Sequence, residues 1–181
     1  MDAIKTRRSI RKYRPEQIRD EELLTVLEAG TFAPTGKNRQ DPFIVAVQNE
    51  ELMKRLIRMN AEIMGTESNP YYDAPTIVLV FAPAVKDNKN SVQDGSLILG
   101  TMMLAAHSIG LASCWINREM EMFATGEGIE IMKELGIPEG YIGIGALSLG
   151  YSAIPNPKAL PGLPTICFRR TAVSRSWQGQ F

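Results

Sequence analysis

A helix that is apolar on almost every side constrains the fold of this chain more than any other feature. The pattern predicts that this helix opens at Asp94, is apolar from Ser96 to Ile109 and stops at Gly110. A helix with apolar residues all round cannot face water on any side without exposing a large apolar area. We therefore expect it to be buried inside the fold or to form a contact between subunits.

Apolar runs elsewhere predict an alternation of helices and strands. The run Thr76–Phe81 is apolar at nearly every position, which is typical of a strand covered on both faces. Further strands are predicted at 43–47, 112–116 and 142–151, and further helices at 20–30, 49–63 and 129–135. No repeat or linker divides the chain, so we expect one α/β domain over residues 1–181, with 164–181 as a C-terminal tail whose order the sequence leaves open.

Charge and cysteine content exclude several classes of protein. Lys plus Arg and Asp plus Glu number 20 each, so no overall field would hold a nucleic acid or an anionic membrane. Cys114 and Cys167 are too few for a disulfide framework or a zinc site, which favours a reduced, cytoplasmic setting. We expect no secretory signal and no membrane span. Glycine-rich nucleotide-binding turns are missing from the sequence, so a nicotinamide would bind only as a transient substrate.

The N-terminal segment Thr6–Tyr13 carries three arginines around one serine. Guanidinium groups make bidentate contacts with phosphate oxygens, so this segment is a candidate anion site. If a short helix capped by Asp2 ran into the segment, Arg7 and Arg11 would share one face, and one anion could meet several donors. The alternative is a solvated basic end of a surface helix, where most isolated basic runs lie.

A second segment, Ala33–Gln40, reads Ala-Pro-Thr-Gly-Lys-Asn-Arg-Gln and precedes a predicted strand. The two segments together resemble the flavin mononucleotide (FMN) site of the nitroreductase family, which opens with Arg-Arg-Ser-x-Arg-x-Tyr and continues with Ala-Pro-Ser-x-x-Asn-x-Gln. Here Thr35 replaces the serine and keeps the hydroxyl group. The order of the later segments also matches, including a Gly-x-x-x-Cys-Trp strand and a Gly-Tyr strand end.

The resemblance implies an α+β fold of the nitroreductase type, in which helices flank a mixed central sheet and two chains form a homodimer. It implies FMN at the subunit interface, with the chemistry carried by flavin N5 and with no catalytic side chain or metal. NADH or NADPH would deliver hydride to the flavin. An electron-poor acceptor, such as a nitroaromatic or a quinone, would then take the electrons in a ping-pong cycle.

The resemblance assigns the N-terminal segment to the phosphate and to one edge of the flavin ring. Arg7 and Ser9, with Arg8 in part, match positions that hold the phosphate. Arg11 matches the position whose cation lies near N1 and O2 of the ring. A fixed positive charge there stabilises the negative charge that accumulates on reduction.

Further candidate contacts follow from the same resemblance. Five loop residues would come from the other subunit and cover the dimethylbenzene side and the ribityl chain: Pro34, Thr35, Gly36, Asn38 and Gln40. Three residues would lie beneath the ring, where the family offers a backbone N–H to flavin N5: Trp115, Ile116 and Asn117. Lys158 matches the first member of a second phosphate-binding pair, but Leu160 stands where the family often has an arginine.

The chain departs from the family in the short connection between residues 63 and 76, where larger members carry a segment that roofs the site. The substrate face would then be open or completed by the partner, and Tyr71 and Tyr72 could either stack there or serve packing. His107, the single histidine, lies in the apolar helix and is given no role. Two alternatives stay open: a flavin-binding or sensory module without turnover, and a specialised family reaction such as dehalogenation or flavin fragmentation.

Overall fold

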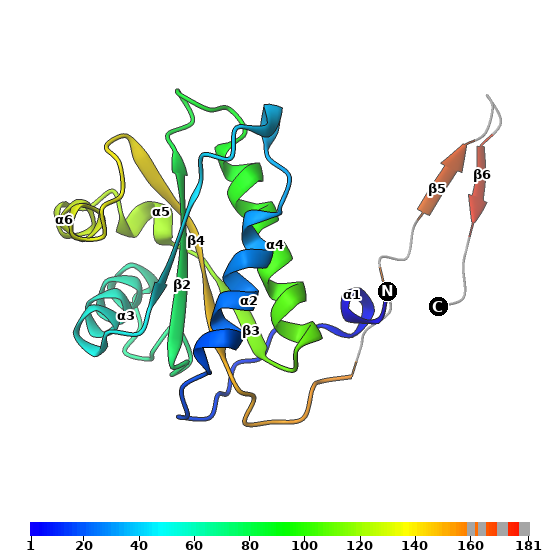
Figure 1. Cartoon of the computed structure of the whole chain (residues 1–181), viewed down its shortest axis with the longest axis horizontal. Helices are drawn as coiled ribbons and strands as arrows, with labels where there is room; N and C mark the ends of the chain where they lie inside the picture. Colours follow the sequence, from blue (N-terminus) through cyan, green and yellow to red (C-terminus); the bar gives the residue numbers. More distant parts are fainter. Residues whose placement is uncertain (159–161, 163–165, 170–173, 178–181) are drawn as a thin grey trace.

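A four-stranded sheet forms the centre of the computed structural model, which describes residues 1–158, 162, 166–169 and 174–177 (Figure 1). In spatial order its strands are β1 (Phe43–Val47), β2 (Thr76–Pro83), β4 (Tyr141–Gly150) and β3 (Ala112–Ile116). Each strand runs antiparallel to its neighbours. Within the described residues, the parallel component of this mixed sheet is limited to one bridge between Ser9 and Ser113.

Helices cover both faces of the sheet, as Figure 1 shows. One face carries α2 (Asp20–Thr31) and α4 (Ser91–Ser108), and the other carries α3 (Glu50–Met64), α5 (Glu119–Met122) and α6 (Gly126–Glu134). The short helix α1 (Asp2–Thr6) lies beside the C-terminal end of α4. This arrangement confirms the expected α+β fold.

Strand β2 is the axis of the core. All eight of its residues are buried, which confirms the prediction of a strand covered on both faces. Val78 and Val80 pack among side chains of α2 and α4, whereas Ile77 and Leu79 pack among those of α3, α5 and α6. The alternation follows from the pleat of a strand, and each such side chain contributes roughly 1.5–3 kcal/mol on burial.

Helix α4 is buried on one side only. Ile98, Leu99 and Met102 pack against the sheet. On the opposite side of the helix, the residue Leu97 is 48% exposed and the residue Val92 is 39% exposed. The expectation of burial inside the fold is therefore confirmed for one side of the helix. The other side is an exposed apolar face that a second chain could cover.

The arginine segment is not helical, so the shared helical face considered for Arg7 and Arg11 is wrong. Helix α1 is preceded by Met1 without a side-chain cap and ends at Thr6, after which Arg7 is extended with φ −55° and ψ 133°. A helix of five residues gains few hydrogen bonds against the cost of nucleation. The residues that follow it pair with β3 instead.

Smaller differences concern the ends of elements. Helix α4 begins at Ser91, three residues before the predicted opening, and the four-residue helix α5 was not predicted. In the C-terminal tail, β5 (Ile166–Arg169) pairs with β6 (Ser174–Trp177), while Leu160 lies outside the described residues.

The single-domain boundary stays a prediction. No helix in the described part of the chain has the length and apolar character that crossing a membrane would require.

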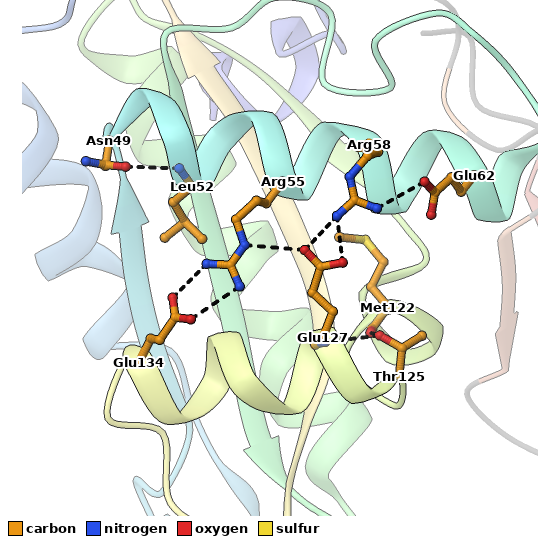
Figure 2. Close-up of polar contacts among 10 residues, drawn as sticks. Asn49, Leu52, Arg55, Arg58, Glu62, Met122, Thr125, Glu127 and Glu134 are labelled. Atoms are coloured by element: carbon orange, nitrogen blue, oxygen red, sulfur yellow. Dashed lines mark hydrogen bonds and ion pairs between the residues drawn. The ribbon is translucent and has the colours of Figure 1, made fainter.

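An ion-pair network joins α3 to α6 on the outer side of the sheet (Figure 2). Glu127 accepts hydrogen bonds from Arg58 Nη2 at 2.6 Å and from Arg55 Nε at 3.3 Å. Arg55 also donates to both carboxylate oxygens of Glu134, at 2.8 and 3.2 Å. Arg58, assisted by Arg55, holds the pKa of Glu127 below its ordinary value.

Replacing Glu127 by glutamine should lower the free energy of unfolding by less than about 1 kcal/mol, because half-exposed ion pairs are screened by water and salt. The lowered pKa means that the contribution is full above pH 4.5 and is lost as the pH falls below that value. Urea unfolding at pH 7 and pH 3, in low and high salt, measures this. Glu130→Gln, a change at an exposed position of the same helix, is the matched control, and equal behaviour of the two variants would contradict the assignment.

Candidate functional site

The extended segment after α1 runs along the edge strand β3. Ser9 forms a parallel bridge with Ser113, and the N–H of Ile10 donates to the carbonyl of Ser113 at 3.1 Å. In an extended chain successive side chains alternate, so Arg7, Ser9 and Arg11 point to one side. The β-bridge therefore places the guanidinium groups of Arg7 and Arg11 and the hydroxyl group of Ser9 in a row along the sheet edge.

Buried Cys114 marks the side to which this row points. Burial raises the pKa of the Cys114 thiol, and three neighbours oppose the shift: the charge of Arg11, a hydrogen bond with Ser9 and the charge of Arg7. All three members of the row thus lie near one thiol of β3. This concentrates positive charge beside the middle of β3.

Arg8 has a different role from its neighbours. Its guanidinium folds back onto α1, donating from Nη2 to the carbonyl of Lys5 at 2.8 Å and from Nη1 to the carbonyl of Arg7. These carbonyls lie at the C-terminal end of the helix, where cations are favoured. Arg8 therefore satisfies the end of α1 and offers less of its fork to a ligand than the sequence suggested.

A cavity of about 280 Å³ lies between the segment that follows α1, the end of α4 and the start of β3. Its lining includes Arg7, Arg8, Ser113, His107 and Asn156. Within the described residues, Arg7 Nη1 and Arg8 Nε are buried without a hydrogen-bond partner. Because an unpaired buried donor of a charged group is costly, an anion is the partner that this arrangement lacks.

Two further residues of this cavity are His107, which had no role assigned from the sequence, and Asn156, which no predicted site included. His107 Nε2 lies 2.8 Å from the hydroxyl oxygen of Thr6, and Asn156 Nδ2 donates to the carbonyl of Thr6 at 2.9 Å. Both contacts fasten α1 to distant parts of the chain. The one sequence signal for these contacts is the position of His107 in the last turn of the predicted apolar helix. Lys158 is exposed and follows Asn156 by two residues.

Arg11 contacts Tyr72, whereas Tyr71 lies in the core. The Arg11 guanidinium carbon lies 5.8 Å from the ring centre of Tyr72, a cation–π distance, and a hydrogen bond with Tyr72 raises the pKa of Arg11. Tyr71 is fully buried and packs within the core. Of the two tyrosines, only Tyr72 is exposed enough to meet a ligand.

The loop Pro34–Gln40 has an unusual backbone. Three of its residues that are not glycine, Lys37, Asn38 and Gln40, have φ between 51° and 57°, in the left-handed region. The Thr35 hydroxyl accepts the N–H of Gln40 at 3.0 Å, and Gln40 Nε2 donates to Asn38 Oδ1 at 3.2 Å. Such conformations persist only where the surroundings fix them and are common at ligand sites.

Gly36 anchors this loop to the start of α4. Its N–H donates to Asp94 Oδ1 at 2.8 Å, and a Cβ at this position would lie 2.1 Å from Asn90 Nδ2. The loop is thus fixed to one end of α4, while α1 lies at the other end, as Figure 1 shows. There the hydroxyl group of Thr6 in α1 contacts His107. Thirteen residues separate Asp94 from His107, so the two ends are about 20 Å apart.

A buried polar cluster supports the end of β3. Asn60 Nδ2 donates to the carbonyl of Asn117 at 2.9 Å, and Arg118 Nη1 donates to Asn60 Oδ1 at 3.3 Å. Trp115 packs its ring under α4, beside Gly145, and its Nε1 is buried with no hydrogen-bond partner in the described part of the chain. Ile116 is buried and Asn117 is exposed, so the backbone at 116–117 is where β3 reaches the surface.

One protomer brings together part of the predicted site. The four N-terminal candidates lie along β3, whose C-terminal end carries the candidates at 115–117. The five loop candidates lie at the far end of α4. Their separation is consistent with a loop that serves another chain's site.

Known proteins resemble this chain in sequence and in fold. A nitroreductase with bound FMN from Bacteroides fragilis is 33% identical, with a TM-score of 0.77, over 88% of this chain and 93% of that one. A nitroreductase with bound FMN from Desulfitobacterium hafniense is 29% identical, with a TM-score of 0.79, over 89% and 93%. A relative from Archaeoglobus fulgidus, named for NADH dehydrogenase and NAD(P)H nitroreductase activity, is 31% identical over 82% of each chain.

The Nitroreductase family itself matches residues 4–151, a range that includes the sheet, the arginine segment and the loop. The sequence match and the fold therefore agree, and the chain belongs to the nitroreductase family.

Proposed function

We propose that this protein is an FMN-dependent oxidoreductase that takes electrons from NADH or NADPH and passes them to an electron-poor acceptor such as a nitroaromatic or a quinone. The observation that carries the proposal is the row of Arg7, Ser9 and Arg11 along β3, beside a cavity that lacks an anion. FMN-bound nitroreductases of the same fold support the choice of cofactor.

The residues fit a phosphate at one end of the row. Arg7 Nη1 has no partner among the described residues, and a phosphate oxygen would supply one. Ser9 adds a hydroxyl donor two positions further along the same side. Lys158 follows the segment that Asn156 fastens to α1, so its charge would add to the same end.

The residues at the other end fit a flavin ring. Arg11 would supply positive charge to the pyrimidine edge, and the backbone at Trp115–Asn117 would offer hydrogen-bond groups beneath the ring. When bound, FMN supplies the hydride and electron transfer between the nicotinamide and the acceptor. The protein's part is to bind the phosphate, orient the ring and hold charge at its edge.

A homodimer would complete the site. If α4 packs against its copy across a two-fold axis, the Asp94 end of one helix lies beside the His107 end of the other. The loop Pro34–Gln40 of one chain would then cover the arginine segment of its partner. The exposed apolar side of α4, with Leu97 and Val92, supports this pairing.

The short connection between α3 and β2 supports an open substrate face. Only residues 65–75 join these elements, and Tyr71 is buried within them. Flat acceptors would be held mainly by stacking, which discriminates weakly. We therefore propose several nitroaromatic and quinone acceptors rather than one. A flavin-binding module without turnover is the alternative that the test below separates.

Anaerobic mixing of the FMN-loaded protein with NADH and with NADPH tests the proposal. Loss of the oxidised flavin absorbance, followed by its return when a nitroaromatic or a quinone is added, would establish the activity. Persistent colour with both nicotinamides would mean a binding module. A protein that takes up no FMN would contradict both.

Replacing Arg7 by alanine should weaken FMN binding roughly 10- to 100-fold, because one charge-assisted hydrogen bond contributes about 1.5–3 kcal/mol. Fluorescence titration with FMN measures the dissociation constant. Lys12→Ala is the matched control, since it removes an exposed positive charge from the other side of the same segment. If both variants bind FMN with equal affinity, the phosphate site is misassigned.

A further inference from the structure

A chain of buried polar groups lies behind the end of β3. Glu119 is 1% exposed, and Tyr71 and Asn60 are fully buried. The Tyr71 hydroxyl donates to Glu119 Oε1 at 3.0 Å, and Asn60 Nδ2 donates to the Tyr71 hydroxyl at 3.4 Å. The second hydrogen of Asn60 Nδ2 reaches the carbonyl of Asn117, at 2.9 Å. The chain therefore connects a buried carboxyl group to the backbone proposed to lie beneath the flavin ring.

Asn60 holds a backbone turn that would otherwise be unfavourable. Arg118 has φ 87° and ψ 4°, a left-handed conformation that costs free energy in a residue with a Cβ. Asn60 donates a hydrogen bond to the carbonyl of Asn117, the residue before Arg118, and accepts one from the side chain of Arg118 through Nη1. The orientation of the Asn117–Arg118 peptide thus depends on the side chain of Asn60.

We propose that Glu119, Tyr71 and Asn60 form a positioning unit that fixes the Asn117–Arg118 peptide at the flavin, and that loss of the proton from Glu119 releases this peptide. The proposal rests on the proposed function, because it assigns the peptide to the flavin site. None of the three residues touches the reacting atoms. They act through the backbone that they hold.

The surroundings of Glu119 favour its neutral form. Burial raises the pKa of Glu119 to about 8, and the opposing effects come from backbone and Tyr71 hydrogen bonds and from the charge of Arg118. Glu121 is the nearby acidic group and raises the value further. Glu119 Oε2 has no hydrogen-bond partner among the described residues, so an anion there would be poorly compensated.

Deprotonation gives the unit a second arrangement. The Glu119 anion attracts the Arg118 guanidinium, which in the neutral state donates to Asn60 Oδ1. Moving that guanidinium removes one of the two contacts by which Asn60 holds the turn. The physical consequence is a looser Asn117–Arg118 peptide above about pH 8.

The first test measures the rate at which NADH reduces the flavin of the FMN-loaded protein. The pH runs from about 6.5 to about 9.5, which extends about 1.5 pH units to each side of the pKa of Glu119. The wild type should lose rate on the order of tenfold above pH 8, since small displacements at a reacting centre cost up to about 10². Glu119→Gln should flatten this step, and Tyr71→Phe should move it to higher pH, because the Tyr71 hydrogen bond lowers the pKa of Glu119. Glu130→Gln, the same change as Glu119→Gln on an exposed helix surface, should keep it. A step that persists in Glu119→Gln would overturn the proposal.

A second test needs no flavin and so separates this proposal from the proposed function. In a Trp177→Phe background, Trp115 is the one remaining tryptophan and lies two residues before Asn117. Its fluorescence should change between pH 7 and 9 in that background and stay constant when Glu119→Gln is added. A failure to bind FMN alongside this pH response would contradict the function and keep the switch. A constant fluorescence in both proteins would overturn the switch, whatever the flavin does.

Discussion

Replacing Gly128 by alanine is expected to destabilise the protein strongly. An added Cβ would lie 2.1 Å from the carbonyl oxygen of Met122 and 2.6 Å from the Cα of Phe123. Both are backbone atoms, so no side-chain rotation can relieve the contact, and α6 must move away from α5. Overpacking of this kind costs on the order of 3 kcal/mol. For a chain of this size the thermal midpoint should fall by about 6–12 °C.

Gly126→Ala is the matched control for this prediction. It lies two residues earlier in the same helix, and no heavy atom lies within 4 Å of an added Cβ. Alanine there should be neutral or slightly stabilising, because it reduces the freedom of the unfolded chain. Thermal unfolding of the two variants gives the comparison. Similar midpoints for both would show that α6 does not approach α5 as closely as the structure indicates.

Replacing Leu97 by aspartate should convert the proposed dimer into monomers that no longer retain FMN. Leu97 is 48% exposed in the single chain and lies on the apolar side of α4. A carboxylate buried in an interface with its two-fold copy would place two like charges in a desolvated contact. Light scattering measures the mass, and gel filtration with absorbance detection measures the retained flavin. FMN binding should stabilise the wild-type dimer against heat, because FMN binds the folded form.

Ile129→Asp separates this effect from a general loss of stability. Ile129 is 43% exposed and lies on α6, which covers the opposite face of the sheet. That variant should remain dimeric and keep its flavin. A Leu97→Asp protein that is still a dimer with bound FMN would rule out α4 as the interface. A wild-type monomer that binds FMN at full stoichiometry would exclude the shared site altogether.

The elements that could be predicted from the sequence are those with a strong local pattern. The short run Thr76–Phe81 is apolar at nearly every position and rich in β-branched residues, which is typical of a strand covered on both faces, and β2 is such a strand. The helix predicted at 49–63 begins at Asn49, which caps α3: its Oδ1 accepts the N–H of Leu52 at 2.9 Å, as Figure 2 shows. Local chemistry decides these features, so they need no knowledge of distant contacts.

The features that could not be predicted depend on contacts between distant residues. The arginine segment has helical spacing, yet its pairing with Ser113 keeps it extended. Gly126 and Gly128 look equivalent in sequence, and only the approach of α5 distinguishes them. Glu119 lies in a charged stretch typical of a surface, whereas α5 buries it against Tyr71. The candidate residues themselves came from the family resemblance, and their roles stay predictions.

The two halves of the candidate site are fixed to opposite ends of the rigid helix α4, about 20 Å apart. If two chains share each site, damage to the arginine segment and damage to the loop affect different sites of a mixed dimer. A chain with Arg7→Ala paired with a chain altered at Gly36 would hold one doubly damaged site and one intact site. Two alleles that are each inactive could then complement one another in the same cell. The activity of such a cell would then depend on which two chains form the dimer, because neither chain alone could form an intact site.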